Sequence, residues 1–395
     1  MTSKGETAPT RVARETIETL DPRVLESLVG RSLFLTSDWS FPQIETLARV
    51  AGVFQQLDRA RVRTPLFPEE LFLSLFFDSS TRTRSSWAGA AARLGASPAI
   101  FDGTSTQVAH GETAAETGAM LGMNAHALGI RHDLILGEGN RFMREAHGGI
   151  ARYLEEIGDE RVVPLVNLQC DVDHPTQSLA DLRRLQEIFS DGPEGKTIAV
   201  SWAYSPSYAK PLSVPQGLIT LLPRFGMNVR LAAPPGYDLL PQCLDDAARF
   251  AEEGGGTFVR CDSMDEAFDG ADVVYPKSWG PMDLMLERVE ANRAGDRGAL
   301  DRIEAAALER NRGFTDWICD ERRMGLTRDG AARYMHCLPA DIGAEVSPGV
   351  MDRFRTDVAR EANHKVYVIM AMLAVAKEPR LVARLAEFTE GAVER

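Results

Sequence analysis

The feature that most constrains the fold is a stretch in which an apolar run gives way to a hydroxyl-rich turn and then to an alanine-rich segment. The apolar run is Leu71–Phe77, the turn is Asp78–Arg84, and the segment Trp87–Leu94 is closed by Gly95. This order predicts a buried strand, a tight turn and a helix whose small residues let it lie close against a sheet. The first turn of such a helix carries unpaired N–H groups and a positive dipole.

Hydroxyl groups and an arginine stand at this helix start, so an oxyanion, above all a phosphate, is the natural ligand. The candidate phosphate-binding residues are Ser80, Thr81, Arg82 and Thr83. The alternative is an ordinary N-cap with solvent-exposed arginines, because serine and threonine caps are common. Arg84 has the further alternative of facing an acidic neighbour. This stretch alone leaves both interpretations open.

Strand–loop–helix units recur along the whole chain. Further strands are expected at 97–101, 127–130, 162–168, 197–202, 228–232, 257–260, 271–275 and 332–335. Helices are expected between them, at 113–123, 141–157, 178–189, 218–225, 241–253 and 283–325. This alternation is typical of parallel, doubly wound sheets. We therefore expect an α/β fold of two Rossmann-like domains with an active-site cleft between them.

The first domain is expected to comprise residues 1–177, completed by a C-terminal helical segment at 360–395, and the second to comprise 178–359. Residues 1–20 are polar and are expected to be loose or used in subunit packing. Three prolines in 203–217 predict a stiff loop with little helix, and such a loop in a compact domain usually has a functional or topological role. The helical pattern from 366 onward is expected to break at Pro379.

The composition excludes several functional classes. The 395 residues are 44% hydrophobic and 26% charged, as in ordinary soluble proteins, and a net charge of −13 argues against nucleic acid as a partner. The longest apolar runs, such as Val366–Ala376, are too short to cross a bilayer, and no signal peptide is visible, so we expect a cytoplasmic protein without a membrane partner. The five cysteines are scattered, which predicts neither a disulfide framework nor a zinc site.

Polar clusters fall at the expected C-terminal ends of strands in four places, namely Ser80–Arg84, Arg131, His174 with Gln177, and His336–Leu338. Open α/β sheets bind ligands at these ends, and a cleft between two domains would bring the clusters together. The helix start would hold phosphate, Arg131 and His174 would donate to a carbonyl oxygen, and Gln177 with backbone carbonyls of the last cluster would accept from an NH2 group. The expected ligand therefore has a phosphate at one end and a carbamoyl group at the other.

Each of these residues also has a simpler interpretation. His174 could cap the following helix, His336 could be a satisfied core histidine, and Cys337 could be a small apolar filler. Lys277 could be a solvated loop charge, and Trp279 could merely pack. The functional interpretation is favoured because all of these alternatives would have to hold at once. A nicotinamide-binding enzyme is disfavoured, because no GxGxxG follows a strand.

Three motifs carry a family resemblance. The sequences Ser-Thr-Arg-Thr-Arg at 80–84, His-Pro-Thr-Gln at 174–177 and His-Cys-Leu-Pro at 336–339 resemble, in order, those of the aspartate and ornithine carbamoyltransferases. The His-Cys-Leu-Pro wording favours the ornithine branch. The stretches 203–217 and 275–280 resemble the knotted branch, which includes N-acetylornithine carbamoyltransferase, and so imply a trefoil knot in the second domain. The amino-acid sequences at 166–178 and 202–208 resemble those of the YgeW-type group within that branch.

The resemblance implies a carbamoyltransferase in which a neutral amine attacks the carbamoyl carbon and phosphate leaves, without a metal or redox cofactor. The implied partners are carbamoyl phosphate and a small amine, in a homotrimer or dimer of trimers with sites shared between subunits. Gln107 and His110 would reach into a neighbouring subunit's site. The implied roles are phosphate binding by Ser80, Thr81, Arg82 and Thr83, carbonyl polarisation by Arg131 and His174, NH2 binding by Gln177, and contact with the carbamoyl group and amine by Cys337 and Leu338. The catalytic residues would be His174, Arg131 and Cys337.

Departures from the family bear on the acceptor. The arginine that ornithine enzymes carry before the final helix is missing from Glu361–Lys365, where His364 or Lys365 would substitute. The ornithine-gripping Asp-x-x-x-Ser-Met sequence is absent, and Tyr275–Gly280 stands there instead. An acidic Asp341 follows His-Cys-Leu-Pro, where the acetylornithine enzymes have basic residues. The expected acceptor-binding residues are Lys277, Ser278, Trp279, His336 and Asp341.

An acidic Asp341 beside Lys277 suits an acceptor with one ammonium and one carboxylate group. We therefore hypothesise a short diamino acid such as 2,3-diaminopropionate, with the physiological direction of the reaction open. The alternatives are ornithine, an N-acylornithine, or a catalytically idle homologue that only binds carbamoyl phosphate.

Overall fold

The computed structural model describes residues 7–393, which divide into two compact units by their contacts. Unit 1 holds the chain up to residue 132, residues 140–169 and the chain from 363 onward, and unit 2 holds 133–139 and 170–362. The predicted class of two α/β modules with parallel sheets is confirmed. The roles expected for the two domains stay predictions.

Unit 1 is built on a four-stranded sheet with the order β2-β1-β3-β4. The strands are β1 (Leu71–Phe76), β2 (Ser97–Asp102), β3 (Ala127–His132) and β4 (Leu165–Cys170). β1 runs parallel to both β2 and β3, and Phe76 at its end lies opposite Asp102 on one side and Arg131 on the other. The carboxyl ends of these three strands therefore meet at one edge of the sheet.

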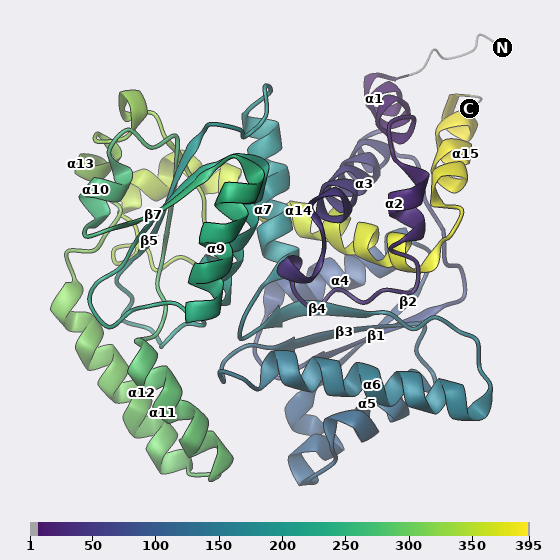
Figure 1. Cartoon of the computed structure of the whole chain (residues 1–395), viewed down its shortest axis with the longest axis horizontal. Coiled ribbons are helices and arrows are strands. Elements are labelled where there is room, and N and C mark those ends of the chain that lie inside the picture. The colour runs from purple at the N-terminus through teal and green to yellow at the C-terminus, as the bar shows by residue number, and fades with distance from the viewer. Residues whose placement is uncertain (1–6, 394–395) are drawn as a thin grey trace. The chain divides into compact units, whose positions relative to one another are not determined.

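Helices cover both faces of this sheet, which explains why β1 and β4 are buried along nearly their whole length. Figure 1 shows α5 and α6 on one face, and α3, α4 and part of α14 on the other. The helices with residues in unit 1 are α1 (Ala8–Ile17), α2 (Pro22–Glu26), α3 (Phe41–Arg59), α4 (Thr81–Arg93), α5 (Ala114–Gly122), α6 (Gly139–Ile157), α14 (Pro348–Lys377) and α15 (Leu381–Val393).

The contact between α5 and α6 is close enough to require glycine. A Cβ on Gly118 would lie 2.0 Å from the carbonyl oxygen of Ala146, and a Cβ on Gly149 would lie 2.0 Å from that of Ala115. The neighbouring Gly148 has nothing within 4 Å of its Cβ position. The two helix backbones therefore touch directly at Gly118 and Gly149.

Unit 2 contains a five-stranded sheet with the order β7-β6-β5-β8-β9. Its strands, all paired in parallel, are β5 (Thr197–Trp202), β6 (Asn228–Ala232), β7 (Thr257–Cys261), β8 (Val273–Lys277) and β9 (Arg333–Tyr334). Trp202 pairs with Lys277 at the carboxyl ends of β5 and β8. His336 follows two residues after β9 and so emerges near the same edge.

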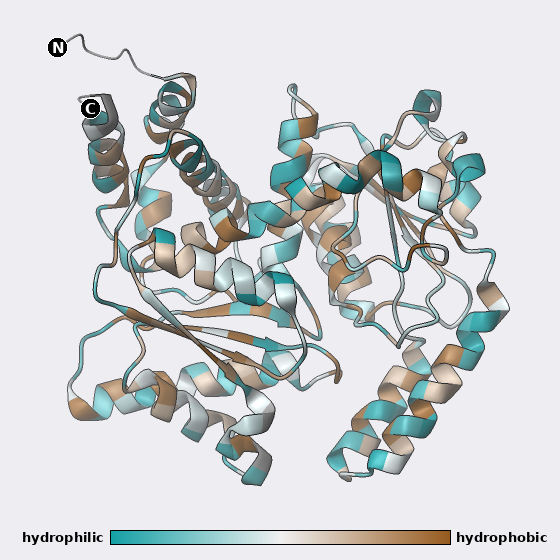
Figure 2. Cartoon of the chain, turned by 180° about the vertical axis from the view of Figure 1, so that it is seen from behind, coloured by the Kyte–Doolittle hydropathy of each residue, from teal (hydrophilic) through white to brown (hydrophobic). Residues whose placement is uncertain are grey.

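The helices of unit 2 surround this sheet. They are α7 (Pro175–Ile188), α8 (Ser213–Leu221), α9 (Pro241–Gly254), α10 (Met264–Phe268), α11 (Met282–Arg293), α12 (Arg297–Asn311) and α13 (Glu321–Met324), together with the first half of α14. Figure 1 shows α11 and α12 side by side as a projecting antiparallel pair. In Figure 2 the strands of both sheets are largely hydrophobic, whereas α11 and α12 alternate between hydrophilic and hydrophobic residues.

The expectation that the first 20 residues are loose is wrong for 8–17. These residues form α1, which is capped by Thr7 and contacts α3 and α15. Ala13 and Ile17 are buried. The polar composition concealed a narrow apolar stripe, which is sufficient to dock a short helix.

Two further expectations need correction. The proline-rich stretch is irregular only as far as 212, because α8 starts at Ser213 and includes Pro215 in its first turn, where no intrahelical N–H bond is lost. The C-terminal helix starts at Pro348 rather than at 366, because its first half is amphipathic and lacked a continuous apolar run. The predicted break at Pro379 is confirmed, since α14 ends at Lys377 and α15 begins at Leu381. The knot stays a prediction.

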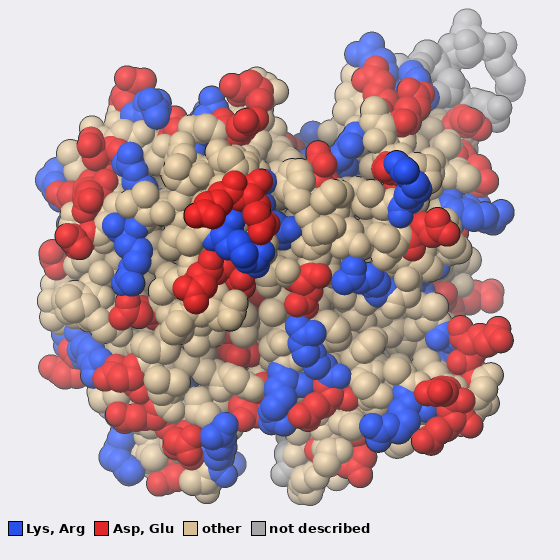
Figure 3. All heavy atoms as spheres, viewed as in Figure 1, with Lys and Arg blue, Asp and Glu red and all other residues tan. Residues whose placement is uncertain are grey.

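The membrane, cysteine and charge expectations can be compared with the structure directly. No helix within residues 7–393 combines the length and apolarity needed to cross a membrane. All five cysteines are buried free thiols. Basic and acidic side chains intermingle over the face drawn in Figure 3.

Candidate active site

The start of α4 is held by a serine cap. Ser80 occupies the N-cap with extended backbone (φ −156°, ψ 114°), and its side chain accepts a hydrogen bond from the N–H of Thr83 at 3.2 Å. The capping interpretation of Ser80 is therefore correct. A serine cap pairs one N–H group of the first turn, and an anion at the same helix start would meet the others.

Thr83 lies in the same turn and has an unusual environment. Its side chain is 1% exposed, and Oγ1 is buried without a hydrogen-bond partner among residues 7–393. A buried hydroxyl without a partner costs free energy, so it marks a place where a ligand is expected to complete the contacts. Thr81 is exposed and Arg82 is half-buried in the same turn.

Arg84 is used by the protein itself. Its guanidinium forms an ion pair with Asp102 and lies over the Phe76 ring, 4.6 Å from the ring centroid. The alternative of an acidic neighbour is therefore correct for Arg84. Because Phe76, Asp102 and the α4 start lie at the same sheet edge, this ion pair helps to fix the turn that precedes α4.

Arg131 and Gln107 are the remaining candidates in unit 1. Arg131 is half-buried near the end of β3, and its carbonyl oxygen accepts a hydrogen bond from the N–H of Phe77 at 2.9 Å. This bond ties the end of β3 to the turn that leads into α4. Gln107 begins the short 3-10 helix η3 (Gln107–His110), and its side chain is exposed, as is that of His110.

His174 and Gln177 lie at the start of α7 in unit 2. His174 occupies the N-cap position, but its side chain makes no capping hydrogen bond, so the helix-cap alternative is wrong for this residue. Its ring is 3% exposed, and Nδ1 lies 3.2 Å from Oγ1 of Thr176.

The amide of Gln177 has a defined orientation. Nε2 donates to Oδ1 of Asp181 at 2.5 Å and to Oε1 of Glu361 at 3.4 Å. Oε1 of Gln177 is buried and has no partner within residues 7–393. An amide with both hydrogens committed presents its oxygen as an acceptor. This is the orientation that binding of an NH2 group requires.

The two carboxyl groups beside Gln177 are themselves anchored. Asp181 accepts a hydrogen bond from the Tyr275 hydroxyl at 3.2 Å, and Glu361 accepts one from the backbone N–H of His336 at 3.1 Å. Burial, together with the neighbouring charge of Asp181, raises the pKa of Glu361 well above its usual range. The raised pKa favours the neutral form of Glu361, which reduces repulsion between the two carboxyl groups.

His336 is held between two tyrosine rings, with centroids 6.2 Å from Tyr275 and 6.3 Å from Tyr334. Nδ1 accepts a hydrogen bond from the N–H of Leu338 at 2.9 Å, so in the neutral ring the proton lies on Nε2. Nε2 faces Oε2 of Glu345 at 3.6 Å. Burial lowers the pKa of His336, although Glu345 opposes this. Nδ1 is thus satisfied by the protein, whereas the buried Nε2 has no hydrogen-bond partner within residues 7–393, so His336 is not the fully satisfied core histidine of the simpler interpretation.

The turn after His336 is strained. Leu338 has φ +53°, which is unusual for a bulky residue, and the Leu338–Pro339 peptide is cis. A positive φ at a residue other than glycine is most common at functional sites, where surrounding contacts impose it. Cys337 is buried beside it, with 7% exposure.

Lys277 is a buried cation at the end of β8, with 5% exposure. Nζ donates to the carbonyl oxygen of Ser278 at 2.7 Å, and Lys277 forms no ion pair among residues 7–393. Burial and the nearby Lys210 charge lower the pKa of Lys277. An ammonium group in this situation retains N–H donors for an anionic ligand.

The side chains of Trp279 and Ser278 differ in whether their hydrogen-bonding group already has a protein partner. Trp279 is fully buried, and its Nε1 donates to the carbonyl oxygen of Tyr237 at 2.9 Å, as the packing alternative predicts. Ser278 is also fully buried, but its Oγ has no hydrogen-bond partner within residues 7–393.

Lys210 and Glu345 are central residues that the motifs did not reveal. Nζ of Lys210 lies 2.8 Å from Oε2 of Glu345 and 2.9 Å from Oδ2 of Asp341. Lys210 is 1% exposed and Glu345 is fully buried. The signal that could have revealed this pair is the position of Lys210 within the proline-rich stretch 203–217. A lysine that is buried in such a stretch requires an anionic partner.

Glu345 connects the two expected acceptor-binding segments. Its carboxylate accepts hydrogen bonds from the backbone N–H groups of Ser278 and Asp341, each at 2.8 Å. Although burial acts in the opposite direction, His336 and Lys210 hold the pKa of Glu345 well below its usual range. This buried, charged carboxylate therefore holds the end of β8 and the turn after His336 close together.

Asp341 is partly exposed, with 23% exposure of its side chain. Its Oδ2 contacts Lys210 and accepts hydrogen bonds from the hydroxyl groups of Ser205 and, at 3.1 Å, Ser207. Oδ1 makes no hydrogen bond or ion pair with any residue of the described chain. One carboxylate oxygen thus anchors Asp341 and the other stays available.

Comparison with known families gives a direct result. The model described as "aspartate/ornithine carbamoyltransferase, carbamoyl-P binding domain" matches residues 31–187, and the corresponding Asp/Orn binding domain matches residues 212–376. The chain belongs to the aspartate/ornithine carbamoyltransferase family. This carbamoyltransferase is therefore an enzyme that transfers carbamoyl groups, and the family predicted from the three motifs is confirmed.

Individual relatives agree with this assignment. The chain is 45% identical over 377 residues to the putative carbamoyltransferase YgeW of Escherichia coli K12, covering 92% of this chain and 94% of the relative. It is 29% identical to an N-acetylornithine carbamoyltransferase of Xanthomonas campestris pv. campestris, covering 86% and 95% of the two chains. An ornithine carbamoyltransferase of Anoxybacillus flavithermus is 28% identical, with 88% and 96% covered. The predicted resemblance to the YgeW-type group is confirmed.

Solved structures show the same fold. A crystal structure of N-acetyl-L-ornithine transcarbamylase matches with a TM-score of 0.70 and 26% identity, covering 87% of this chain and 98% of the other. Acetylornithine transcarbamylase in complex with acetylcitrulline matches with a TM-score of 0.71 and 25% identity, covering 88% and 99%.

Proposed function

We propose that this carbamoyltransferase moves the carbamoyl group between carbamoyl phosphate and one amine of a short diamino acid such as 2,3-diaminopropionate. The observation that carries the acceptor assignment is the position of Lys277 and Asp341 around Glu345. The carboxylate of Glu345 binds the backbone N–H of Asp341 and that of Ser278, which directly follows Lys277. The two segments that carry a buried ammonium group and an available carboxylate oxygen are thereby joined through Glu345.

This pair selects for charge. Lys277 would bind the α-carboxylate of the acceptor, and Oδ1 of Asp341 would bind its α-ammonium group. The second, neutral amine then faces the carbamoyl carbon. An N-acylated acceptor has no α-ammonium group to satisfy Asp341, so a free amino acid fits better.

For the donor, we propose phosphate binding by Ser80, Thr81, Arg82 and Thr83. The unpaired buried hydroxyl of Thr83 and the capped start of α4 support this assignment. Arg131 and His174 would donate to the carbonyl oxygen. Gln177 would accept from the NH2 group through Oε1, which has no protein partner within residues 7–393. Cys337 and Leu338 would face the carbamoyl group.

The proposed contacts define the reaction. The lone pair of the neutral amine attacks the carbamoyl carbon, and negative charge develops on the carbonyl oxygen beside Arg131 and His174. The C–N bond forms, and the C–O bond to phosphate breaks with its electron pair going to phosphate. The amine loses one proton, and the leaving phosphate takes it up. Orientation and charge stabilisation supply the catalysis. Loss of one such donor should reduce kcat by about 10²–10³.

A substrate panel tests the acceptor. The purified protein is assayed with carbamoyl phosphate and 2,3-diaminopropionate, 2,4-diaminobutyrate, ornithine, N-acetylornithine or N-succinylornithine. The reverse direction is assayed with the corresponding ureido acids and phosphate. The highest kcat/KM is expected for the shortest free diamino acid. No turnover with any free diamino acid would overturn the acceptor proposal.

N-acylornithine is the second candidate, because the solved structures named above are N-acetylornithine transcarbamylases. Asp341→Arg separates the two, since it should reduce turnover of a free diamino acid and favour an N-acylated one.

A catalytically idle homologue that only binds the donor is the remaining alternative, and calorimetry tests it. Binding of carbamoyl phosphate that is lost in Arg82→Ala, without turnover of any amine, would support this alternative.

A further inference from the structure

Unit 1 contains a cavity of about 550 Å³ that the carbamoyl transfer reaction does not use. It lies at the C-terminal ends of α3 and α4, whereas the proposed donor phosphate site is at the N-terminal end of α4. A 13-residue helix is about 20 Å long, so the two places are well separated. The volume is in the range of small-molecule sites.

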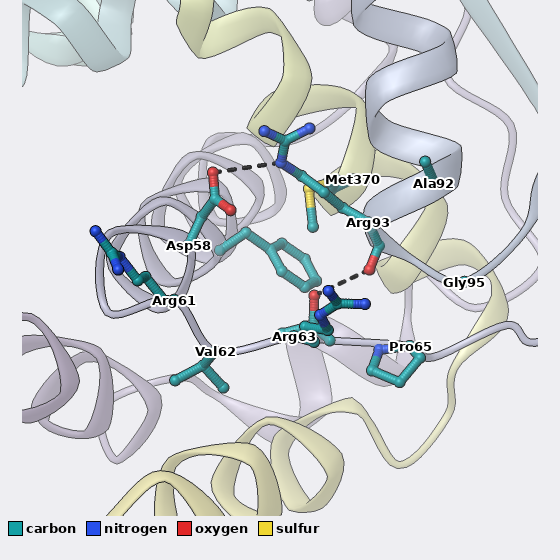
Figure 4. A pocket seen from close by; sticks show the side chains of 11 residues that line it. Asp58, Arg61, Val62, Arg63, Pro65, Ala92, Arg93, Gly95 and Met370 are labelled. Carbon is teal, nitrogen blue, oxygen red and sulfur yellow. Dashed lines mark hydrogen bonds and ion pairs between the residues drawn. The ribbon is translucent and has the colours of Figure 1, made fainter.

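The charge of this cavity is unusual for an acidic protein. Arg61, Arg63 and Arg93 line it together with a single carboxylate, Asp58, so three positive charges face one negative charge. Figure 4 shows the three arginines on different sides of the pocket. Asp58 is already engaged, since it accepts from Nε of Arg93 at 3.3 Å and from the Tyr367 hydroxyl at 2.7 Å. The net charge of the lining is therefore +2.

Two of these arginines are uncommitted. The side chains of Arg61 and Arg63 make no hydrogen bond or ion pair with any residue in the range 7–393, whereas Arg93 is held by Asp58 and by the carbonyl oxygen of Gly89. A guanidinium group matches the oxygens of a phosphate or carboxylate in a bidentate manner. A local cationic surface on a protein of net charge −13 concentrates anions at that place.

The backbone at Arg61 provides an independent observation. α3 and α4 end with the same turn, in which the N–H of Val62 bonds to the carbonyl of Leu57 and the N–H of Ala96 bonds to that of Ala91. The left-handed residue of this turn is Gly95 after α4 (φ +87°) but Arg61 after α3 (φ +60°). Glycine is the favoured residue there, and a side chain adds strain. The chain thus accepts strain where it places a guanidinium group at the cavity.

The floor of the cavity is apolar. Val62 and Pro65 provide the accessible apolar part of its lining, whereas Phe54 and Met370 are each only 1% exposed. Inorganic phosphate would satisfy the arginines but leave this surface uncovered. An anion with a flat apolar body would bury it and gain affinity.

We propose that this cavity is a second binding site, which takes an organic phosphate monoester with a flat apolar body. The phosphate group lies between Arg61 and Arg63, and the body rests on Val62 and Pro65. This proposal is independent of the identity of the amine acceptor.

Isothermal titration calorimetry of the full-length protein tests the site. The Arg82→Ala background removes phosphate binding at the start of α4, and the probes are phenyl phosphate, adenosine 5′-monophosphate and inorganic phosphate. The two organic monoesters are expected to bind at least about tenfold more tightly than inorganic phosphate. Equal affinity of all three, or no binding of either monoester, would overturn the proposal.

Arg61→Gly is the decisive variant, because glycine suits the left-handed backbone. It should lower monoester affinity by about tenfold or more while it raises the melting temperature. Glu69→Gly is the matched control, since Glu69 also has a left-handed backbone (φ +69°) but does not line the cavity. It should leave monoester affinity unchanged. Loss of affinity in both variants, or in neither, would contradict the assignment. Arg63→Ala provides a second test without a backbone effect.

Discussion

At the scale of single residues, the orientation of Gln177 is the most informative detail. Its amide nitrogen donates to Asp181 and Glu361, and this leaves its buried oxygen as an acceptor. Rotation of the amide would place that oxygen against two carboxyl groups. Asp181 and Glu361 thus act as positioning residues for the proposed contact with the NH2 group of the donor.

Asp181→Leu should weaken donor binding. The substitution removes the carboxylate that accepts from Nε2 of Gln177 at 2.5 Å, so the amide loses its fixed orientation. We expect the KM for carbamoyl phosphate to rise about tenfold, as for loss of one charged hydrogen bond. Tyr275→Phe is the control, because it removes the other hydrogen bond of Asp181 and leaves that to Gln177. An equal change of KM in both variants would show that Asp181 acts only through folding.

Lys277→Met should separate function from stability. Burial lowers the pKa of Lys277 in the folded state, so the unfolded chain binds this proton more tightly. The free energy of unfolding contributed by Lys277 is therefore lowest below its folded-state pKa and rises as pH increases toward its unfolded pKa of about 10.4. The variant should be at least as stable as the parent at pH 7, and its advantage should shrink by pH 10. Urea titrations across this range check the trend.

The same variant should raise the KM for the amine acceptor strongly, because the proposed partner of its carboxylate is removed. Steady-state assays with the preferred acceptor measure this effect. A variant that is destabilised at pH 7 and retains its acceptor KM would indicate a purely structural lysine.

At the scale of secondary-structure elements, direct backbone contact between α5 and α6 determines how these two helices pack on one face of the unit 1 sheet. α5 and α6 touch through Gly118 and Gly149, where any side chain would meet a backbone carbonyl. Backbone atoms cannot move aside as a flexible side chain can, so the two helices must shift together to accept a larger residue. The position of α5 in turn fixes the segment that carries Gln107.

Gly149→Ala should destabilise unit 1 by about 1–3 kcal/mol, the usual cost of an overpacked contact. Gly148→Ala, one residue earlier in α6, faces open space and should stabilise by about 0.5–1 kcal/mol, because alanine is the better helix former. Thermal unfolding of both variants measures the contrast. A stabilising Gly149→Ala would mean that α5 and α6 are less tightly packed than the structure shows.

At the scale of the whole molecule, a site shared between subunits, as the family resemblance implies, would make activity a property of the assembly. Gln107 is exposed on unit 1, as a residue that serves a neighbouring subunit should be. Arg82 belongs to the proposed phosphate site of its own subunit. The two residues would therefore complete one site from two chains.

Mixing inactive Gln107→Ala and Arg82→Ala proteins tests this arrangement. If each site takes Arg82 from one subunit and Gln107 from another, random hybrid trimers regain about a quarter of the wild-type sites. Activity should appear only after the mixed chains are dissociated and reassembled. An unchanged, inactive mixture would place both residues in the same subunit's site or exclude a shared site.

Local patterns in the sequence determined the class of fold and the donor motifs. The strand–turn–helix around Ser80 is readable because a buried strand, a cap and an alanine-rich helix each obey short-range rules. The same rules failed for α1 and the first half of α14, where amphipathic stripes are diluted by polar residues. The three motifs also indicated the family, because each keeps several chemically specific residues in consecutive positions.

Only the tertiary structure decided how these residues are held. Lys210 contacts Glu345 across 135 positions of the chain, and Gln177 contacts Glu361 across 184. Such contacts leave no local period in the sequence, because they arise only when segments far apart in the chain fold together. The motifs therefore named Gln177, Lys277 and Asp341, whereas the fold fixed the direction of the amide, the burial of the lysine and the carboxylate that joins them.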